Sequence, residues 1–306
     1  MGRVGVDLYP LESGVPLAEV RTFGRFLGGS PTNVAVAAAR LGRRTAVITK
    51  VGDDGFGVYV RRALRSFGVD DRWVGTDPEL RTPIVFCELH PPDRFPLLFY
   101  REPRAPDLNL RPEELDLTAI AAARILWTTG TGLSEEPSRS ATLAALAARP
   151  LGAITVHDLD HRRQFWRDPD EARRHALRAL TSATVVVGNA EEAEVVVGSG
   201  TPDEQARRLL DLGPELAVVK LGPEGALAAT AGGTVRVPGI DVPVVCGLGA
   251  GDAFGGALCH GLLAGWDLER TLSFANAAGA IVASRLACAD ASPTIEEVEA
   301  LLARHA

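Results

Sequence analysis

A glycine-rich turn that ends in an aspartate is the part of this sequence best suited to chemistry. The stretch Val244–Leu263 reads VVCGLGAGDAFGGALCHGLL, and Asp252 follows Gly249, Ala250 and Gly251. Small residues let backbone N–H groups approach a ligand, and the first turn of a helix favours an anion because its N–H groups have no partner within the helix. We therefore expect a phosphate site at this turn.

Two common phosphate-binding patterns do not fit the turn. A Rossmann fingerprint requires GxGxxG, but the sixth position is Asp252 when counted from Gly247 and Phe254 when counted from Gly249. A Walker A loop requires a lysine that this stretch lacks.

Phosphoryl transfer to an alcohol would give the carboxylate of Asp252 a function. It would accept the hydroxyl proton while the oxygen attacks phosphorus, and we expect the helix dipole to keep it ionised and a weak base. The alternative is a first-turn acid that stabilises the helix by about 0.3–1 kcal/mol and has no catalytic part.

The elements around the turn predict an α/β fold. Apolar runs bounded by glycine alternate with amphipathic stretches, which is typical of βαβ units around a mostly parallel, buried sheet. We expect helices at 31–42, 137–149, 168–180 and 202–213, and strands in RTAVITKVG, ARILWTTG, AITVHDLD, ATVVVGN, LAVVKLG and VPVVC.

Two segments interrupt this alternation, 9–27 and 81–101. They contain proline, aromatic and β-branched residues without a helical pattern, and TPIVFCELH and FPLLFYR predict strands of a separate small sheet. We expect residues 1–306 to form one domain in which these segments make a lid.

Composition restricts the class of protein. The chain has 306 residues, 46% of them apolar, with a net charge of −7, and this acidity argues against a nucleic-acid partner. No run approaches the ~18 apolar residues of a membrane span, no leader pattern begins the chain, and the four cysteines are widely spaced. We expect a cytoplasmic protein without a membrane partner, a disulfide framework or a zinc site.

Two long motifs resemble those of one enzyme family. GLGAGDAFGGAL resembles the C-terminal signature of the ribokinase-like, or PfkB, carbohydrate kinases, and GGSPTNVAVAAARLGRRTAVITKVGDDGFG (Gly28–Gly57) resembles their N-terminal signature. The resemblance covers nearly the whole chain. It implies a mainly parallel central sheet flanked by helices, a small β-sheet lid over a sugar, and ATP and Mg²⁺ as cofactors.

The resemblance also implies roles for individual residues. Asp252 would be the base, with Gly249, Ala250 and Gly251 as the anion hole. Sugar contacts would come from Asp7, Gly28, Gly29 and Asn33, magnesium contacts from Asn189 and Glu192 of GNAEE, and ATP contacts from Lys220, Gly222 and Gly225 of KLGPEG and from Asn276.

Structural alternatives stay open for several of these residues. Asn189 suits a helix cap and Glu192 a first-turn acid, the glycines of KLGPEG suit a hairpin turn, and Asn33 suits a polar position near a helix start.

The substrate is indicated by two further segments. HDLDHRRQFW and FYREPRAPDL resemble elements of family members that phosphorylate keto-deoxy sugar acids, which implies Arg162, Tyr100 and Arg101 as contacts. A guanidinium can hold a carboxylate through two parallel charge-assisted bonds. A metal site at His157 and His161 is the weaker interpretation, because no third ligand motif stands nearby.

Whole segments are most similar to members that act on 5-dehydro-2-deoxy-D-gluconate in myo-inositol catabolism. Kinases of 2-dehydro-3-deoxygluconate, fructose or ribose are alternatives, and a sugar-acid sensor with a decayed kinase site is a non-enzymatic one. The resemblance further implies a homo-oligomer, with a dimer through the lid as one form.

The chain departs from the family at two places. Cys246, Gly247 and Leu248 replace an Asp-Thr-Thr run that often helps to bind a monovalent cation, so cation dependence stays open. The first strand also begins abruptly, so either the start is misassigned or another segment covers that edge.

Overall fold

The computed structural model describes residues 1–305, and its centre is a six-stranded sheet. Four strands are parallel neighbours, and a hairpin extends them antiparallel at one side. In spatial order the strands are β14 (Gly233–Val237), β13 (Ala226–Thr230), β12 (Leu216–Lys220), β11 (Val185–Asn189), β10 (Ile154–Asp158) and β9 (Ile125–Thr129). The parallel strands end at one edge of the sheet, which is where α/β folds place their ligands.

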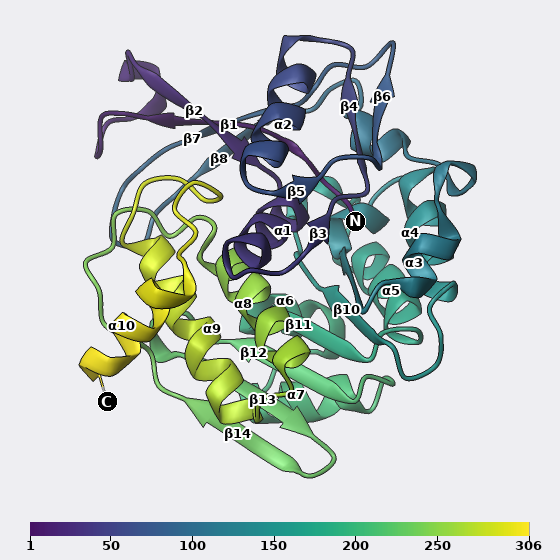
Figure 1. Cartoon of the computed structure of the whole chain (residues 1–306), viewed down its shortest axis with the longest axis vertical. Coiled ribbons are helices and arrows are strands. Elements are labelled where there is room, and N and C mark those ends of the chain that lie inside the picture. The colour runs from purple at the N-terminus through teal and green to yellow at the C-terminus, as the bar shows by residue number, and fades with distance from the viewer. Residues whose placement is uncertain (306) are drawn as a thin grey trace.

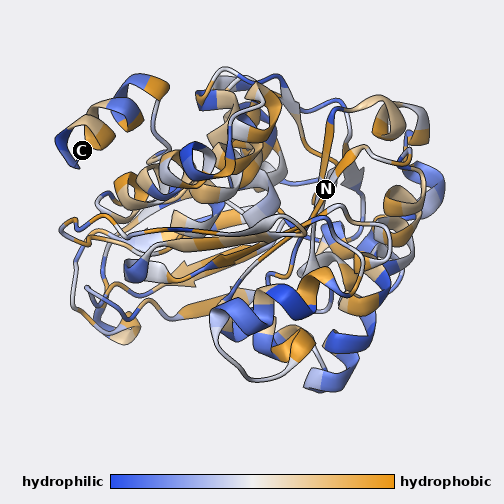
Figure 2. Ribbon diagram, turned by 90° about the horizontal axis from the view of Figure 1, so that it is seen from below, coloured by the Kyte–Doolittle hydropathy of each residue, from blue (hydrophilic) through white to orange (hydrophobic). Residues whose placement is uncertain are grey.

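Helices cover both faces of this sheet, and each face has its own apolar cluster. Alternate strand residues point to opposite sides, so Val187 and Val218 face one layer while Val186 and Val219 face the other. Figure 2 shows the apolar strands between helices that are polar on their outer sides. The first layer contains α1 (Ser30–Arg40), α8 (Ala250–Ala264), α9 (Leu268–Ala283) and α10 (Ile295–His305), and the second contains α5 (Pro169–Leu180), α6 (Ala190–Val197) and α7 (Pro202–Leu210).

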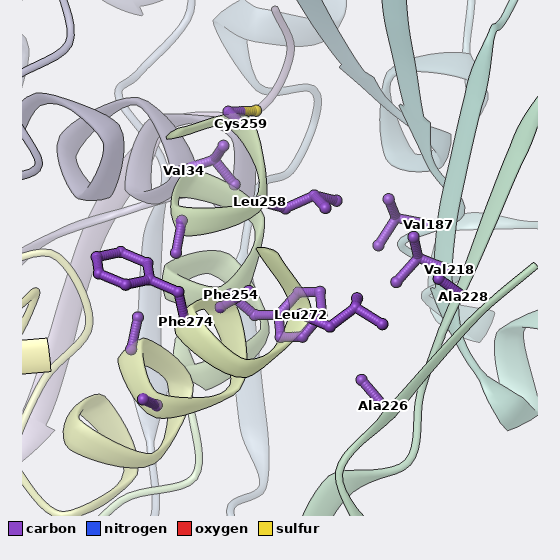
Figure 3. Packing of buried hydrophobic residues seen from close by; sticks show 14 of the residues in the cluster. Val34, Val187, Val218, Ala226, Ala228, Phe254, Leu258, Cys259, Leu272 and Phe274 are labelled. Carbon is purple, nitrogen blue, oxygen red and sulfur yellow. The ribbon is translucent and has the colours of Figure 1, made fainter. Parts of the chain in front are cut away.

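The largest cluster fixes α8 against the sheet. Leu258 of α8 and Leu272 of α9 are fully buried and point toward Val187 and Val218 (Figure 3). Gly256 lies against α1, where an added Cβ would come within 2.5 Å of the Cβ of Ala37. The two helices that carry the signature motifs are therefore packed backbone to backbone, so their first turns are held together.

A second, four-stranded sheet projects from the body at the upper left of Figure 1. We call it the small sheet, and its order is β2 (Phe23–Gly28), β1 (Gly5–Pro10), β7 (Ile84–Cys87) and β8 (Leu97–Tyr100). Both segments expected to form a lid contribute strands to it, although β1 begins at residue 5 and residues 11–22 lie outside its strands. Two parallel pairs, β3 (Thr45–Ala46) with β5 (Val69–Asp70) and β4 (Thr49–Gly52) with β6 (Val74–Asp77), lie beside α2 (Gly55–Ser66).

The predicted α/β class and most predicted elements are present. Helix α4 (Ser138–Ala147), α5 and α7 fall within the expected ranges, and a short α3 (Leu117–Ala122) precedes β9. None of the helices within residues 1–305 has the length and hydropathy needed to cross a bilayer.

Two strand predictions were wrong. RTAVITKVG forms two short strands, β3 and β4, instead of one. VPVVC forms no strand, because Pro243 has no N–H to donate and the N–H groups of Val245 and Cys246 both bond to the carbonyl of Ala283 at the end of α9.

Candidate active site

Polar residues gather where the parallel strands end. Thr129, Asp158, Asn189 and Lys220 are the last residues of β9, β10, β11 and β12, and the register aligns Asp158 with Thr129 and Asn189 with Lys220. The first turn of α8, which carries Asp252, adjoins this edge, since a Cβ added to Gly251 would lie 3.4 Å from Nζ of Lys220.

Asp252 is held at the start of α8 by two residues of α1. The hydroxyl of Ser30 donates to Oδ1 at 2.7 Å, and Nδ2 of Asn33 donates to Oδ2 at 2.8 Å. Burial raises the pKa of Asp252 above its ordinary value, although these hydrogen bonds oppose the shift. The helix terminus favours the ionised form and burial opposes it, so the expectation of an ionised carboxylate stays a prediction.

The turn before Asp252 has the backbone of an anion site. Gly249 is the N-cap of α8 with φ +82°, and an added Cβ would lie 2.6 Å from Sγ of Cys288. Only glycine fits this left-handed, crowded position without strain. Ala250 and Gly251 form the first helical turn, and the amino group of Lys220 faces Gly251. A positive charge and free helix-terminal N–H groups thus lie beside the carboxylate.

A cavity of about 50 Å³ opens between Asp252 and the small sheet. Six of the residues singled out in the sequence meet around it. Asp7, Gly29, Asn33, Arg162, Gly249 and Asp252 line its wall, together with Arg3, Tyr9, Ser30, Val85, Leu97, Phe99, Leu248 and Cys288. Residues from the two ends of the chain and from its middle therefore share one site.

Asp7 enters the cavity from β1 and is buried. Burial raises its pKa to about 7; the charge of Arg3 opposes this and the charge of Asp252 adds to it. Gly28 makes room for this side chain, because an added Cβ would lie 2.0 Å from Oδ1 of Asp7. Gly29, with φ +104°, turns the chain from the small sheet into α1 against the carbonyl of Arg3.

The three residues expected to recognise an acid are not all brought together. Arg162 lines the cavity and pairs with Asp160 at 3.1 Å. Arg101 is buried in an ion pair with Asp107, which also accepts a hydrogen bond from the N–H of Val4. Tyr100 is 60% exposed, because successive strand residues alternate and Phe99 takes the cavity side.

Asn189 and Glu192 form a capping box at the start of α6. The N–H of Glu192 donates to Oδ1 of Asn189 at 2.8 Å, and the N–H of Asn189 donates to Oε2 of Glu192 at 2.8 Å. The structural alternative for both residues is thus observed. Only one carboxylate oxygen of Glu192 takes part in the box, and the charge of Glu192 acts on Asp158 at the sheet edge.

Sequence reasoning missed two carboxylates at this edge. Asp158 is the last residue of β10, Asp160 lies two residues beyond it, and both are buried. Burial raises the pKa of Asp158, as do the charges of Glu192, Asp160 and Asp252, against the opposing charge of Lys220. Lys220 lies 3.7 Å from Oδ1 of Asp158. The acids of HDLD were the available signal: they lie in the segment whose family resemblance implied Arg162 and in the weaker interpretation of a metal site, but neither singled them out.

These carboxylates suit a magnesium ion that is held partly by waters and substrate phosphates. Among the side chains described, no three from histidine, cysteine, aspartate and glutamate converge as a ready ligand set. Mg²⁺ prefers oxygen ligands, keeps several waters and commonly uses one or two carboxylates plus substrate phosphates. The crowding of acids that raises the pKa of Asp158 would be relieved by such a cation.

The remaining nucleotide candidates border a different loop. Gly222 and Gly225 lie in the turn that joins β12 to β13, as the hairpin alternative predicted. A Cβ added to Gly225 would lie 2.1 Å from the carbonyl of Val237, and Nδ2 of Asn276 donates to the carbonyl of Pro238 at 2.8 Å. Gly225, in the turn before β13, and Asn276, in α9, thus approach the same segment.

Cys246 is buried beside the cavity. It packs with Tyr9, Cys87 and Cys288, and burial raises its pKa to about 11. A neutral thiol therefore occupies the position where the resemblance implies a carboxylate. The hydroxyl of Tyr9 and Sγ of Cys288 lie 2.8 Å apart.

A helix-terminal anion site, an enclosed carboxylate and a polar cavity under a second sheet define a phosphotransferase for a small polar molecule. The chain matches the pfkB family carbohydrate kinase over residues 1–295. It therefore belongs to the PfkB family of carbohydrate kinases, which confirms the predicted family and fold class.

Relatives and solved structures agree over the full length. The chain is 34% identical to 5-dehydro-2-deoxygluconokinase of Shouchella clausii, over 99% of this chain and 94% of the relative. It is 33% identical to the Bacillus subtilis protein of the same name, over 99% of this chain and 94% of that relative. A candidate ribokinase II from Escherichia coli, in complex with ATP and Mg²⁺, superposes with a TM-score of 0.91 at 25% identity, over 99% of this chain and 98% of that one.

A fructokinase from Vibrio cholerae, bound to fructose, ADP and calcium, superposes with a TM-score of 0.86 at 30% identity, over 98% of this chain and 97% of that one.

Proposed function

We propose that this kinase phosphorylates a keto-deoxy sugar acid, with 5-dehydro-2-deoxy-D-gluconate as the substrate and ATP as the donor. The curated relatives that carry this activity in their names support the substrate. The observation that carries the chemistry is Asp252, clamped by Ser30 and Asn33 beside a helix N-terminus and facing a polar cavity. The products would be ADP and the 6-phospho ester, as part of myo-inositol catabolism.

Asp252 would act as the general base. The C6 hydroxyl oxygen forms a bond to the γ-phosphorus, the bond from that phosphorus to the β,γ-bridging oxygen breaks, and ADP leaves. The hydroxyl proton passes to the carboxylate of Asp252. Its raised pKa makes the carboxylate a stronger acceptor than an ordinary aspartate, while two hydrogen bonds fix both oxygens.

The turn Gly249–Gly251 and Lys220 would stabilise the charge on the transferring phosphoryl group. Helix-terminal N–H groups and an ammonium beside Gly251 are fixed before the reaction, so they need no reorganisation during it. Asp158, Asn189 and Glu192 would hold Mg²⁺ through its waters, and the ion would neutralise charge on the ATP phosphates.

Substrate and nucleotide would approach from opposite sides of this turn. On the cavity side, Asp7, Gly28, Gly29, Asn33 and Arg162 would contact the sugar acid. On the other side, Lys220, Gly222, Gly225 and Asn276 would surround ATP, because Gly225 and Asn276 both border residues 237–239.

The small sheet would act as a lid within a single kinase domain, and Arg101 would position its strand β8 through Asp107. Arg162→Ala should raise KM for the sugar acid more than for a neutral ketose, and an equal rise for both would contradict its contact with the carboxylate.

Tyr100, on the outer face of β8, would contribute to a dimer. We also propose a cytoplasmic enzyme, a setting that suits four free cysteines.

The base assignment is tested with Asp252→Asn. We expect turnover to fall by about 10²–10⁴-fold, the size of a general-base contribution, with ATP affinity retained. Asp211→Asn, at an exposed carboxylate, is the matched control. Near-native turnover by Asp252→Asn would contradict this assignment.

The substrate is tested with a panel of 5-dehydro-2-deoxygluconate, 2-dehydro-3-deoxygluconate, fructose and ribose. We expect the highest kcat/KM for 5-dehydro-2-deoxygluconate. Repeating that assay with potassium replaced by tetramethylammonium tests the cation question raised by Cys246.

A further inference from the structure

Arg3 is a cavity residue that the sequence patterns did not single out. It lies two residues before β1, where the chain enters the small sheet, and it lines the same cavity as Asp7, Arg162 and Asp252. Its Nε is shielded from solvent and has no hydrogen-bond partner. Within residues 1–305, its guanidinium makes neither a hydrogen bond nor an ion pair.

The two arginines near Arg3 are already paired. Arg101 is bound to Asp107, and Arg162 lies 3.1 Å from Asp160. Each of those guanidinium groups would have to share its donors with a protein carboxylate to hold a ligand. Arg162 also has a buried Nε without a hydrogen-bond partner, but among these three arginines only Arg3 makes no ion pair.

Aromatic rings fix the position of the Arg3 guanidinium. Its Cζ lies 5.4 Å from the ring centroid of Phe99 and 5.8 Å from that of Phe165, and the two rings meet edge to face at 5.1 Å. Such contacts hold a guanidinium by its face and leave the N–H groups at its edge for a planar acceptor. The backbone of Arg3 is fixed as well, because its carbonyl accepts a hydrogen bond from Thr32 of α1.

An enclosed cation without a partner is unfavourable and is relieved by an anion. Burial lowers the pKa of Arg3; Asp160 opposes this, and the like charges of Arg101 and Arg162 reinforce it. Asp7 faces the same cavity, but its own carboxyl is driven toward the neutral form by burial. The charges of Asp160 and Asp107 favour the guanidinium from a distance, but no carboxylate pairs with it. The cavity therefore combines a fixed guanidinium without an ion pair and a carboxylate, Asp252, at another part of its wall.

We propose that Arg3 binds the carboxylate of the sugar acid and thereby selects acids over neutral ketoses. This inference rests on the proposed function. The carboxylate and the C6 hydroxyl stand at opposite ends of the six-carbon substrate. Arg3, held by Phe99 and Phe165, would take the first end, and Asp252, held by Ser30 and Asn33, would take the second. The paired donors of arginine match a carboxylate in a plane.

The test compares Arg3→Gln and Arg3→Lys with the native enzyme. The matched control is Arg104→Gln, because Arg104 pairs with Glu135 at the surface, away from the cavity. We expect Arg3→Gln to raise KM for 5-dehydro-2-deoxygluconate about 10- to 100-fold, with kcat and the KM for ATP changed less than about threefold. Fructose turnover should change by less than about threefold. The KM of Arg3→Lys for the sugar acid should lie between those of the native enzyme and Arg3→Gln, since lysine keeps the charge but loses the paired donors.

A second readout is independent of turnover. The sugar acid should raise the Tm of the native enzyme and of Arg104→Gln, and this shift should be absent in Arg3→Gln. Without ligand, Arg3→Gln should melt no lower than the native enzyme, because it removes an unpaired charge.

The inference is overturned if Arg3→Gln keeps its KM for the acid within about threefold, retains the Tm shift, or loses acid and fructose activity equally. Those results leave the proposed function standing if the native enzyme still prefers the acid. A native enzyme that neither phosphorylates nor is stabilised by the acid refutes the proposed substrate itself.

Discussion

At the scale of single residues, burial raises the pKa of the carboxylate that we propose as the base. The pKa of Asp252 lies above the ordinary value of 3.8 because enclosure outweighs the hydrogen bonds from Ser30 and Asn33. A base must be ionised, so kcat/KM should fall as pH drops through this raised pKa, approaching tenfold per unit, and should level off above it. The pH profile of kcat/KM checks this, and a midpoint at or below 3.8 would contradict it.

Asp7 should cost stability at neutral pH. Its pKa is about 7 in the folded chain against 3.8 in a free side chain, so the folded state binds the extra proton between those values. Stability is unaffected below about pH 4, decreases as pH rises to 7 and stays reduced above it. Asp7→Asn should therefore raise the free energy of unfolding by about 2–4 kcal/mol at pH 8 and by little at pH 4.

Denaturant unfolding of both proteins at the two pH values measures this difference, with Asp93→Asn, at an exposed carboxylate, as a control. A gain that does not depend on pH would show that the charge of Asp7 is not its cause. The same variant should bind the sugar acid more weakly, since it loses an acceptor for hydroxyl groups.

Single residues differ in how far the sequence can predict them. Asp252 and Gly249 lie in a local pattern whose spacing carries its own chemistry, so their position at a helix start could be predicted. Arg3 could not be singled out, because its significance is the absence of a partner, and a sequence rich in arginine does not indicate which of them is unpaired. Arg101 is the opposite case. It was expected to be free for the substrate, but it pairs with Asp107, only six residues away in the sequence.

At the scale of elements, α6 can separate a capping role from a metal-binding role. Asn189→Ala should cost about 0.5–2 kcal/mol of stability because the cap of α6 is lost. Asn189→Asp keeps a good cap but adds a negative charge at the proposed magnesium position. Asn189→Asp should therefore retain the Tm of the native enzyme and shift the Mg²⁺ concentration that gives half-maximal activity. An unchanged Mg²⁺ dependence in both variants would leave the cap as the only role of Asn189.

Elements with strong periodicity were the predictable ones. The buried strands β9 to β12 are short runs rich in apolar and β-branched residues that turn polar at their carboxyl ends, and their helices carry one apolar face, so both follow from local sequence. VPVVC has the same composition but meets the end of α9 instead of a neighbouring strand. Whether an apolar run finds a strand partner depends on chain topology, which local composition does not carry.

At the scale of the whole molecule, the outer face of the small sheet suits a second copy. Leu98 and Tyr100 are 46% and 60% exposed on β8, and the ring of Tyr100 packs edge-on against Phe86. Leu98→Arg should shift a dimer toward monomer in sedimentation velocity at micromolar concentration. Leu151→Arg, at an exposed leucine in the turn after α4, should not. A native protein that sediments as a monomer would contradict the proposed dimer.

The register of the small sheet sets where its strands join the body. The chain crosses between the sheet and the body at Gly5, Gly28, Ile84 and Tyr100, and each of these is an end residue of its strand. The pairings Gly5 with Gly28, Val6 with Ile84 and Ile84 with Tyr100 set all four crossings along one row. A rotation about this row would carry the distant tip of the sheet far while displacing Asp7, which lies close to the row, only a little. Opening for substrate would thus leave the carboxyl proposed to bind the sugar almost in place.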